Sequence, residues 1–270
     1  MARETTTGEI EMEGAALAGT SLEVSRVALG TWAIGGWMWG GTDEAESIAT
    51  IRAAVEHGIK LIDTAPAYGF GRSEEIVGKA LAEDNLRSRV LIASKVGLEW
   101  QGGKVFRNAG RARILQEVED SLRRLRTDHI DVYQVHWPDP LVTIEETAEA
   151  MHTLFEQGKI RAIGVSNFSV GQMERFRRVA PLHVLQPPYN LFERGIEATF
   201  SPIAERTRSR PSAMARSAAA SCPDGCGRTA NSRATISAAR IRNFSSRVSA
   251  SISLPWHGSI NSPSNASTSA

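Results

Sequence analysis

The sequence has few of the features that mark secreted, membrane-spanning or metal-binding proteins. Its two cysteines, Cys222 and Cys226, lie close together with no second pair, which argues against a disulfide framework or a cysteine metal site. No run of about 18 apolar residues occurs. Residues 1–19 lack the basic and apolar regions of a signal peptide. We therefore expect a soluble, cytoplasmic protein with no membrane partner and no bound metal.

The chain also lacks a strong excess of either charge. The formal net charge of its 270 residues is +1, and 41% of the residues are hydrophobic, enough for a large core. Charge is unevenly distributed, because residues 201–270 contain nine Arg and only two acidic residues, Glu205 and Asp224. The first 200 residues are therefore slightly acidic, and we expect no nucleic-acid partner.

Short apolar runs alternate with longer amphipathic segments along the body of the chain. The apolar runs predict strands at Val27–Leu29, Leu61–Ile62, Val90–Ala93, Ile130–Val135, Ile160–Val165 and Val184–Leu185. The amphipathic segments predict helices at Glu44–Glu56, Glu74–Leu81, Ala109–Leu125, Ile144–Gln157 and Val170–Val179. Such alternation is typical of parallel strands that are joined by crossover helices.

Polar residues gather where the predicted strands end. They are Thr31, Asp63, Lys95, His136, Ser166, Asn167 and Gln186. In a closed barrel these positions converge on the C-terminal rim, where ligands bind, whereas an open sheet would spread them along a crevice. No Gly-x-Gly-x-x-Gly motif follows the first strand, which argues against the open dinucleotide-binding fold. The pattern favours an α/β barrel.

Three of the strand-end residues, together with Tyr68 five residues after Asp63, suit one reaction, the reduction of a carbonyl by a nicotinamide. The cofactor supplies a hydride, and an acid must protonate the developing alkoxide. Tyr68 is the candidate acid. A phenol is a slow donor at neutral pH unless a neighbouring cation stabilises its anion, and Lys95, paired with Asp63, is the candidate cation. His136 would bind and orient the substrate oxygen.

Each of these residues also has a purely structural explanation. Asp63 could cap a turn, Tyr68 could be an amphipathic loop residue, Lys95 could be solvated, and His136 could be a buried histidine. Their occurrence at successive strand ends favours a shared site.

The remaining rim residues suit a cofactor. Ser166 and Asn167 offer a hydroxyl and an amide after one strand, and Gln186 offers a second amide, which could hold the carboxamide of a nicotinamide ring. In the Gly-rich loop at 31–42, Trp32, Trp37 and Trp39 could wall an apolar substrate pocket or simply close the barrel mouth.

Six segments together resemble the aldo-keto reductases over residues 20 to 196. They are Leu29-Gly30-Thr31-Trp32, Asp63-Thr64-Ala65-Pro66-Ala67-Tyr68-Gly69, Ser94-Lys95, Gln134-Val135-His136-Trp137-Pro138, Ile163-Gly164-Val165-Ser166-Asn167-Phe168 and Gln186-Pro187-Pro188-Tyr189-Asn190. The segments at 32–36 and 39–42 resemble most the bacterial stress-associated members that prefer NADPH.

This resemblance implies a (β/α)8 TIM barrel, with residues 1–200 as the barrel domain. It implies a catalytic tetrad of Asp63, Tyr68, Lys95 and His136, with Tyr68 as proton donor, and the reduction of small aldehydes or ketones with NADPH. It also implies that the nicotinamide end of the cofactor is bound by Gly30, Thr31, Trp32, Asp63, Ser166, Asn167 and Gln186.

Residues 201–270 depart from the family pattern. They contain seventeen Ser and thirteen Ala, a low-complexity composition that predicts a disordered tail. The family's seventh and eighth βα units, which cover the cofactor pyrophosphate and hold the adenosine phosphate, are missing from the sequence as written or replaced by this tail. About six βα units remain.

The tail is compatible with an out-of-frame translation. Reading the last base of each codon with the first two of the next, permitted codons for residues 213–225 give Tyr-Gly-Ala-Leu-Cys-Arg-Gly-Leu-Leu-Ser-Gly-Arg, which resembles the family's seventh strand and cofactor loop. Met214 followed by Ala215 forces the Gly in this string. We infer a one-base frameshift near residues 198–200.

Three functions are compatible with the sequence. The leading one is an NADPH-dependent carbonyl reductase. The second is a nucleotide-sensing regulatory subunit, because barrels of this family also serve as cofactor-binding partners of potassium channels. The third is an inactive frameshifted product, because a barrel without two strands has two unpaired edges. The substrate and the oligomeric state have no sequence signal.

Overall fold

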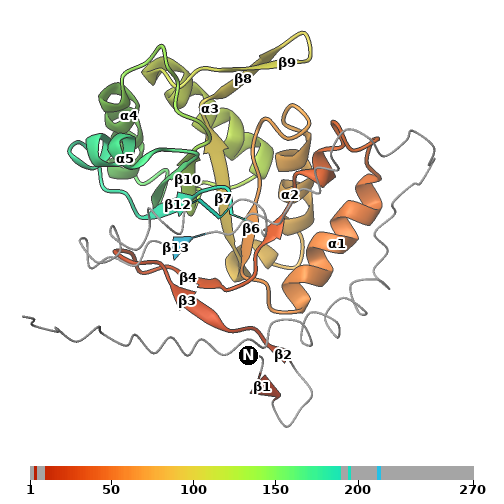
Figure 1. Cartoon of the computed structure of the whole chain (residues 1–270). Helices are drawn as coiled ribbons and strands as arrows, with labels where there is room; N and C mark the ends of the chain where they lie inside the picture. Colours follow the sequence, from red (N-terminus) through yellow and green to blue (C-terminus); the bar gives the residue numbers. More distant parts are fainter. Residues whose placement is uncertain (1–2, 5–9, 190–193, 196–211, 214–270) are drawn as a thin grey trace, which may run out of the picture. The chain divides into compact units, whose positions relative to one another are not determined.

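The computed structural model describes residues 3–4, 10–189, 194–195 and 212–213, which all lie in one compact unit, Ala2–Ala234. Its centre is a parallel sheet in which each strand pairs with the next along the chain (Figure 1). In order these strands are β5 (Leu29–Gly30), β6 (Leu61–Asp63), β7 (Leu91–Val96), β10 (Val132–Val135), β11 (Ile163–Ser166), β12 (Val184–Gln186) and β13 (Ser212–Ala213). The strand order without reversals is that of a barrel and not of a doubly wound sheet.

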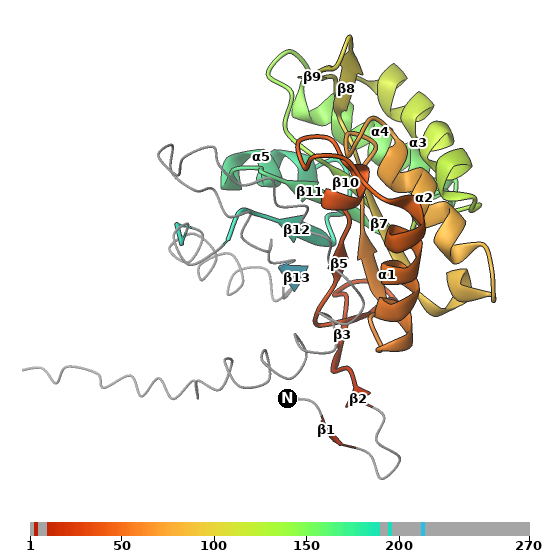
Figure 2. The same cartoon turned by 90° about the vertical axis from the view of Figure 1, so that its right-hand side faces the viewer.

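Helices connect the strands and pack against one another in chain order on the outside of the sheet (Figure 2). They are α1 (Glu44–Glu56), α2 (Arg72–Leu81), α3 (Arg111–Leu125), α4 (Ile144–Glu156) and α5 (Val170–Arg177). Several begin at a residue whose side chain accepts a hydrogen bond from the backbone of the first turn: Asp43 for α1, Thr143 for α4 and Ser169, in a capping box, for α5.

The predicted βα alternation is confirmed, with small shifts at element ends. The helix at Glu44–Glu56 has the predicted bounds. The first barrel strand begins at Leu29 and not at Val27, and Ile130 forms an isolated bridge to Ile160 before β10 begins.

Three antiparallel hairpins and two short 3-10 helices were not predicted. The hairpins are β1 (Arg3–Glu4) with β2 (Ile10–Glu11), β3 (Gly14–Ala16) with β4 (Glu23–Ser25), and β8 (Leu98–Gln101) with β9 (Lys104–Arg107). The 3-10 helices are η1 (Ala33–Gly35) and η2 (Leu86–Arg89).

Two apolar cores lie on the two sides of the parallel sheet. The larger core fills the space between sheet and helices and contains residues such as Ile92, Ile114 and Met151. The smaller core is inside the barrel, where Leu17 and Leu22 of the β3–β4 hairpin pack with inward residues of the strands and their approaches, Leu61, Ala93, Val132, Ala162 and Val184. The hairpin therefore closes the end of the barrel opposite the rim that carries the polar residues (Figure 1).

The tail beyond residue 200 lies outside the described residues except at β13. Ser212–Ala213, in the segment predicted to replace the seventh and eighth βα units, pairs in parallel with β12 as a seventh strand. Within the described part of the chain no eighth strand follows, and β5 and β13 are the edges of the sheet. The predicted disorder of the tail falls on residues that the structure does not describe.

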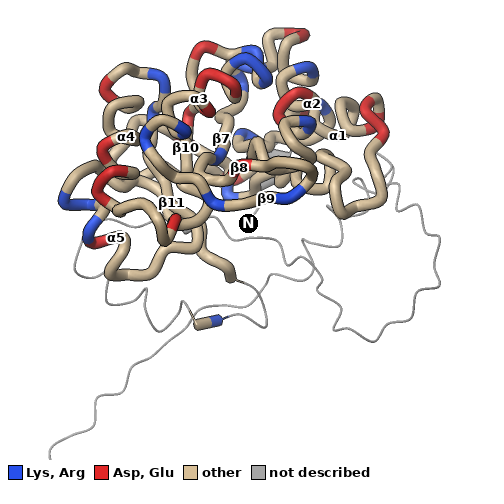
Figure 3. Tube along the Cα trace, turned by 90° about the horizontal axis from the view of Figure 1, so that it is seen from above, with Lys and Arg blue, Asp and Glu red and all other residues tan. Residues whose placement is uncertain are grey.

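Basic and acidic residues are interspersed along the outer helices (Figure 3). Among the helices of the described part, none combines the length and the apolar character needed to cross a lipid bilayer.

Candidate active site

The ends of three neighbouring strands bring Asp63, Lys95 and His136 together. Asp63 is the last residue of β6, Lys95 lies near the end of β7, and His136 directly follows β10. Tyr68 lies in the loop between β6 and α2. Because these strands are parallel neighbours, the four side chains come from one part of the rim.

Lys95 is buried and held in an ion pair. Its Nζ atom donates hydrogen bonds to Asp63 Oδ1 at 2.6 Å and to the carbonyl oxygen of Thr64 at 2.9 Å, and its side chain has 0% exposure. Burial acts to lower the pKa of Lys95, but the Asp63 carboxylate and the Tyr68 side chain outweigh it, and this pKa lies above its ordinary value. Lys95 is thus a cation at neutral pH, and the solvated alternative is wrong.

Tyr68 lies between the cation and the histidine. Lys95 Nζ is 5.0 Å from the centre of the Tyr68 ring. The ring of His136 meets that of Tyr68 nearly at a right angle, with 5.8 Å between centroids. Both residues are buried, at 6% and 4% exposure. The sequence-predicted tetrad is therefore one contiguous cluster.

The loop that carries Tyr68 can be formed only with glycine at two positions. Gly69 has a φ of +67°, and a Cβ atom there would lie 2.0 Å from the carbonyl oxygen of Gly35. A Cβ on Gly35 would in turn lie 2.5 Å from the carbonyl carbon of Tyr68. The Gly-rich loop after β5 is thereby packed directly against the backbone of Tyr68.

The predicted amides lie on the same rim. Gln186 Nε2 donates to Asp63 Oδ2 at 3.3 Å, which joins β12 to the ion pair across the barrel. Asn167, with a φ of +61°, donates from Nδ2 to the carbonyl oxygen of His136 at 2.9 Å and to Ser166 Oγ at 3.0 Å. Ser166 Oγ donates to the backbone oxygen of Gln186 at 2.8 Å. Ser166, Asn167 and Gln186 thus form one network beside the tetrad.

The remaining predicted cofactor residues come from the end of β5. Gly30 pairs with Asp63 in the sheet, and a Cβ placed on it meets no atom within 4 Å. Thr31 is fully buried and donates from Oγ1 to the Asp63 carbonyl oxygen at 3.0 Å. The centroid of the Trp32 ring lies 6.2 Å from that of the Tyr68 ring.

Aromatic rings extend from Tyr68 along the loops of the rim. Trp39 packs edge-on against Trp32, with 5.4 Å between centroids. A second group joins Trp37 to Phe70 at 5.0 Å and Phe70 to Trp100 of β8 at 5.9 Å. Phe70 and Trp100 were not predicted as site residues. The alternating Leu98–Arg107 segment with Gly102–Gly103 at its centre is a hairpin signal that would have placed Trp100 at the rim.

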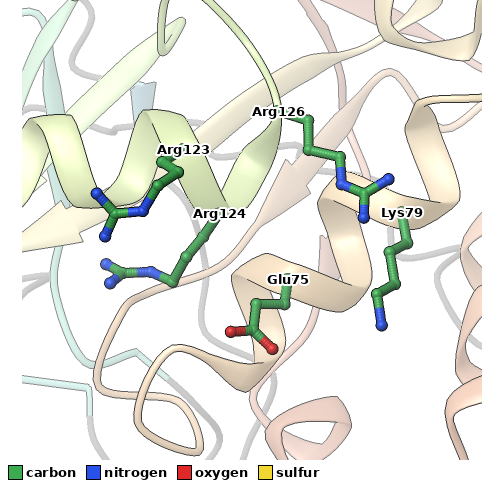
Figure 4. Close-up of a pocket in the computed structure, with 5 residues that line it drawn as sticks. All are labelled: Glu75, Lys79, Arg123, Arg124 and Arg126. Atoms are coloured by element: carbon green, nitrogen blue, oxygen red, sulfur yellow. The ribbon is translucent and has the colours of Figure 1, made fainter.

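A pocket of about 250 Å³ lies elsewhere, between α2 and α3, and is lined by Glu75, Lys79, Arg123, Arg124 and Arg126 (Figure 4). Its cations are largely neutralised, because Lys79 pairs with Glu44, Arg123 with Asp120, and Arg124 with Glu74 and Glu117. Its arginines lie at the C-terminal end of α3, where the helix dipole repels anions, and Glu75 adds a negative charge. We therefore do not interpret it as the functional site.

Metal ligands were not predicted. Across the described residues, no three His, Cys, Asp or Glu side chains group as a metal site would need.

The family model "Aldo/keto reductase family" matches residues 26–209, more than half of the chain. The chain belongs to the aldo/keto reductase family. Aldo-keto reductase YhdN of Bacillus subtilis is 65% identical over 194 residues, which cover 72% of this chain and 59% of that protein. The NADH-specific methylglyoxal reductase of Escherichia coli is 37% identical over 199 residues, covering 68% and 61%. The chain thus spans about three fifths of the length of these relatives.

Solved structures agree with this assignment and confirm the barrel class. Glycerol dehydrogenase from Gluconobacter oxydans is 54% identical, with a TM-score of 0.69 over 75% of this chain and 62% of that one. An aldo-keto reductase from Klebsiella pneumoniae in complex with NADPH is 35% identical, with a TM-score of 0.60 over 73% and 64%. The family match ends at residue 209, nine residues beyond residue 200, where the sequence pattern is lost.

Proposed function

We propose that this aldo/keto reductase family member reduces small aldehydes or ketones to alcohols, with Tyr68 as the proton donor. The observation that carries the proposal is the Asp63–Lys95 ion pair beside the Tyr68 ring. Lys95 Nζ lies 2.6 Å from Asp63 Oδ1 and 5.0 Å from the centre of the Tyr68 ring. A buried cation next to a phenol favours the phenolate that remains after the proton has left.

The roles of the four residues follow from their positions. Tyr68 transfers its phenolic proton to the developing alkoxide, and Lys95 stabilises the charge left on the phenol oxygen. Asp63 holds Lys95 in place and keeps it protonated. His136, edge-on to Tyr68, donates a hydrogen bond to the substrate oxygen and directs it toward the phenol.

The rim also fits the nicotinamide end of NADPH. The Oε1 atom of Gln186 is buried and has no hydrogen-bond partner among the described residues, so it can accept from the amide group of a nicotinamide carboxamide. Ser166, Asn167, Thr31, Trp32 and Gly30 would complete this binding surface. When bound, NADPH supplies the hydride. The NADPH complex from Klebsiella pneumoniae supports this cofactor, whereas the Escherichia coli relative is named as NADH-specific.

The substrate class rests on the relatives and on the chemistry of the rim. The Escherichia coli relative is a methylglyoxal reductase, and methylglyoxal is a small carbonyl compound that the aromatic loop residues Trp32 and Trp39 could cover. We propose a small carbonyl compound as the partner of the site.

We also propose that the codons after about residue 200 are read out of frame. The family-like string obtained from residues 213–225 in the shifted frame supports this, and so does the end of the family match at residue 209, inside the chain. Sequencing the coding DNA around codon 199 tests it. An intact frame whose shifted reading meets an early stop codon would exclude the frameshift.

Two measurements on the full chain separate the functions. Fluorescence of NADPH on titration gives binding, and NADPH oxidation with methylglyoxal gives turnover. Binding with turnover supports the reductase. Binding without turnover supports the nucleotide-sensing alternative, and neither would indicate an inactive frameshifted product.

A further inference from the structure

A cluster of charged and hydroxyl side chains is buried on the helix side of the sheet, behind the candidate active site. The Glu74 carboxylate, at 0% exposure, accepts hydrogen bonds from Ser94 Oγ at 2.5 Å, Arg124 Nε at 2.6 Å and Ser121 Oγ at 3.3 Å. Arg124 also pairs with Glu117, a second fully buried carboxylate. The cluster thus joins helix α2, through Glu74, to strand β7 and helix α3.

Stability alone is a weak explanation for such a cluster. The free-energy cost of removing charges from water offsets their mutual attraction. Apolar side chains of similar volume therefore often stabilise a protein as well or better. Hydrogen bonds, in contrast, have narrow ranges of distance and angle, and therefore fix the elements that they join. The cluster is better explained by the geometry that it imposes on α2 and β7.

On the strand side, the cluster holds Ser94, the residue directly before the candidate catalytic Lys95. Successive side chains of a strand point to opposite faces, so Ser94 faces the helices while Lys95 faces the barrel interior. The bond from Ser94 to Glu74 therefore fixes β7 at the residue next to Lys95.

On the helix side, the residue before Glu74 anchors the loop that carries Tyr68. Ser73 Oγ lies 2.9 Å from the carbonyl oxygen of Thr31, 2.7 Å from Thr31 Oγ1 and 3.0 Å from Thr64 Oγ1. The backbone N–H of Ser73 donates to the carbonyl oxygen of Tyr68 at 3.1 Å. The start of α2 is thus tied to the ends of β5 and β6 and to Tyr68 itself.

We infer that Ser73, Glu74 and Ser94 form a buried clamp that positions Tyr68 against Lys95. Ser73 ties the Tyr68 loop to β5 and β6, and Glu74 ties the same helical turn to β7. The distance between the phenol and the ammonium is then set by two adjacent residues of α2. The clamp residues are positioning residues, and their role in turnover rests on the proposed reductase function.

The test compares Ser94→Ala with Ser121→Ala in the full chain. Each variant removes one hydroxyl that bonds to Glu74, but Ser94 lies on the catalytic strand and Ser121 lies on α3. We expect Ser94→Ala to lower kcat for methylglyoxal about tenfold or more, because small misplacements of reacting groups are costly. The Kd for NADPH should not change, and the pH dependence of kcat should shift. Ser121→Ala should leave kcat within about twofold and its pH profile unchanged.

A second measurement does not depend on turnover. Amide hydrogen exchange in residues 64–73 should become faster in Ser94→Ala and stay as in the wild type in Ser121→Ala, because only the first releases the Tyr68 loop from β7. Faster exchange in Ser94→Ala, combined with no turnover by the wild type, would support the clamp and contradict the reductase. Equal exchange or equal kcat in the two variants, with an active wild type, would overturn the clamp.

Discussion

The Nζ atom of Lys95 lies 5.0 Å from the centre of the Tyr68 ring, although the two residues come from different strand–loop units. Asp63 holds the lysine at 2.6 Å, and the pKa of Lys95 is raised despite burial. Lys95 therefore remains protonated at neutral pH, beside a phenol whose anion it can stabilise.

The ion pair makes a prediction about stability. Asp63→Asn leaves the Lys95 charge buried and unpaired, and we expect the free energy of unfolding to fall by about 3–5 kcal/mol. The double variant Asp63→Asn with Lys95→Met should recover part of this loss, since the uncompensated charge is gone. Urea denaturation of the two variants checks this, and a double variant less stable than Asp63→Asn alone would count against it.

The close packing of α2 on α3 predicts a large effect of one methyl group. A Cβ atom on Gly78 would lie 2.3 Å from the carbonyl oxygen of Arg124, so Gly78→Ala should lower the free energy of unfolding by about 1–3 kcal/mol. Gly171 of α5 is the matched control, because a Cβ there meets no atom within 4 Å. Gly171→Ala should be neutral or stabilising by up to about 1 kcal/mol. Equal effects in thermal denaturation would contradict the packing argument.

His183 predicts a pH dependence of stability. Burial lowers the pKa of His183 below its ordinary value of 6.5. In the fold, its Nδ1 atom accepts the N–H of Ile163 at 3.0 Å. Because the unfolded chain binds the proton more readily, stability from this group is present above pH 6.5 and is lost as pH falls below it.

The corresponding measurement is the free energy of unfolding at about pH 7.5 and about pH 5. His183→Asn should lose less stability over this interval than the wild type. An identical loss in both proteins would show that His183 does not contribute.

The amide network predicts a separate effect on the cofactor. Gln186→Leu removes the unpaired buried oxygen and should weaken NADPH binding by about tenfold, the value of one hydrogen bond. Gln172→Ala, in the capping box of α5, should lower stability slightly and leave the Kd for NADPH unchanged. Fluorescence titration of both variants measures this, and an unchanged Kd in Gln186→Leu would remove that residue from the cofactor site.

Local signals in the sequence were sufficient for the repeating βα order, and they predicted that Asp63, Tyr68, Lys95 and His136 share one site. The helix Glu44–Glu56 was predicted to the residue from its amphipathic pattern, and in the structure Asp43 caps its first turn. The rim residues were found because strand ends in a parallel barrel converge, which is a property of topology and not of any single residue.

The burial of individual polar residues and the contacts between distant segments could not be predicted from local sequence patterns. Glu74 is an acidic residue in the first turn of a helix, where a carboxylate ordinarily faces solvent and the helix dipole favours it. Only the packing of α3 and β7 around α2 makes it a fully buried acceptor. The β3–β4 hairpin was likewise missed, because its apolar residues pack on a core formed by strands that are distant in the sequence.

The most direct test of the central claim is kcat for methylglyoxal in Tyr68→Phe, measured together with the Kd for NADPH. Removal of the phenolic hydroxyl should lower kcat by about 10²–10⁴-fold, the usual contribution of a general acid, while NADPH binds as tightly as in the wild type. A Tyr68→Phe variant that turns over methylglyoxal at the wild-type rate would contradict the assignment of Tyr68 as the proton donor.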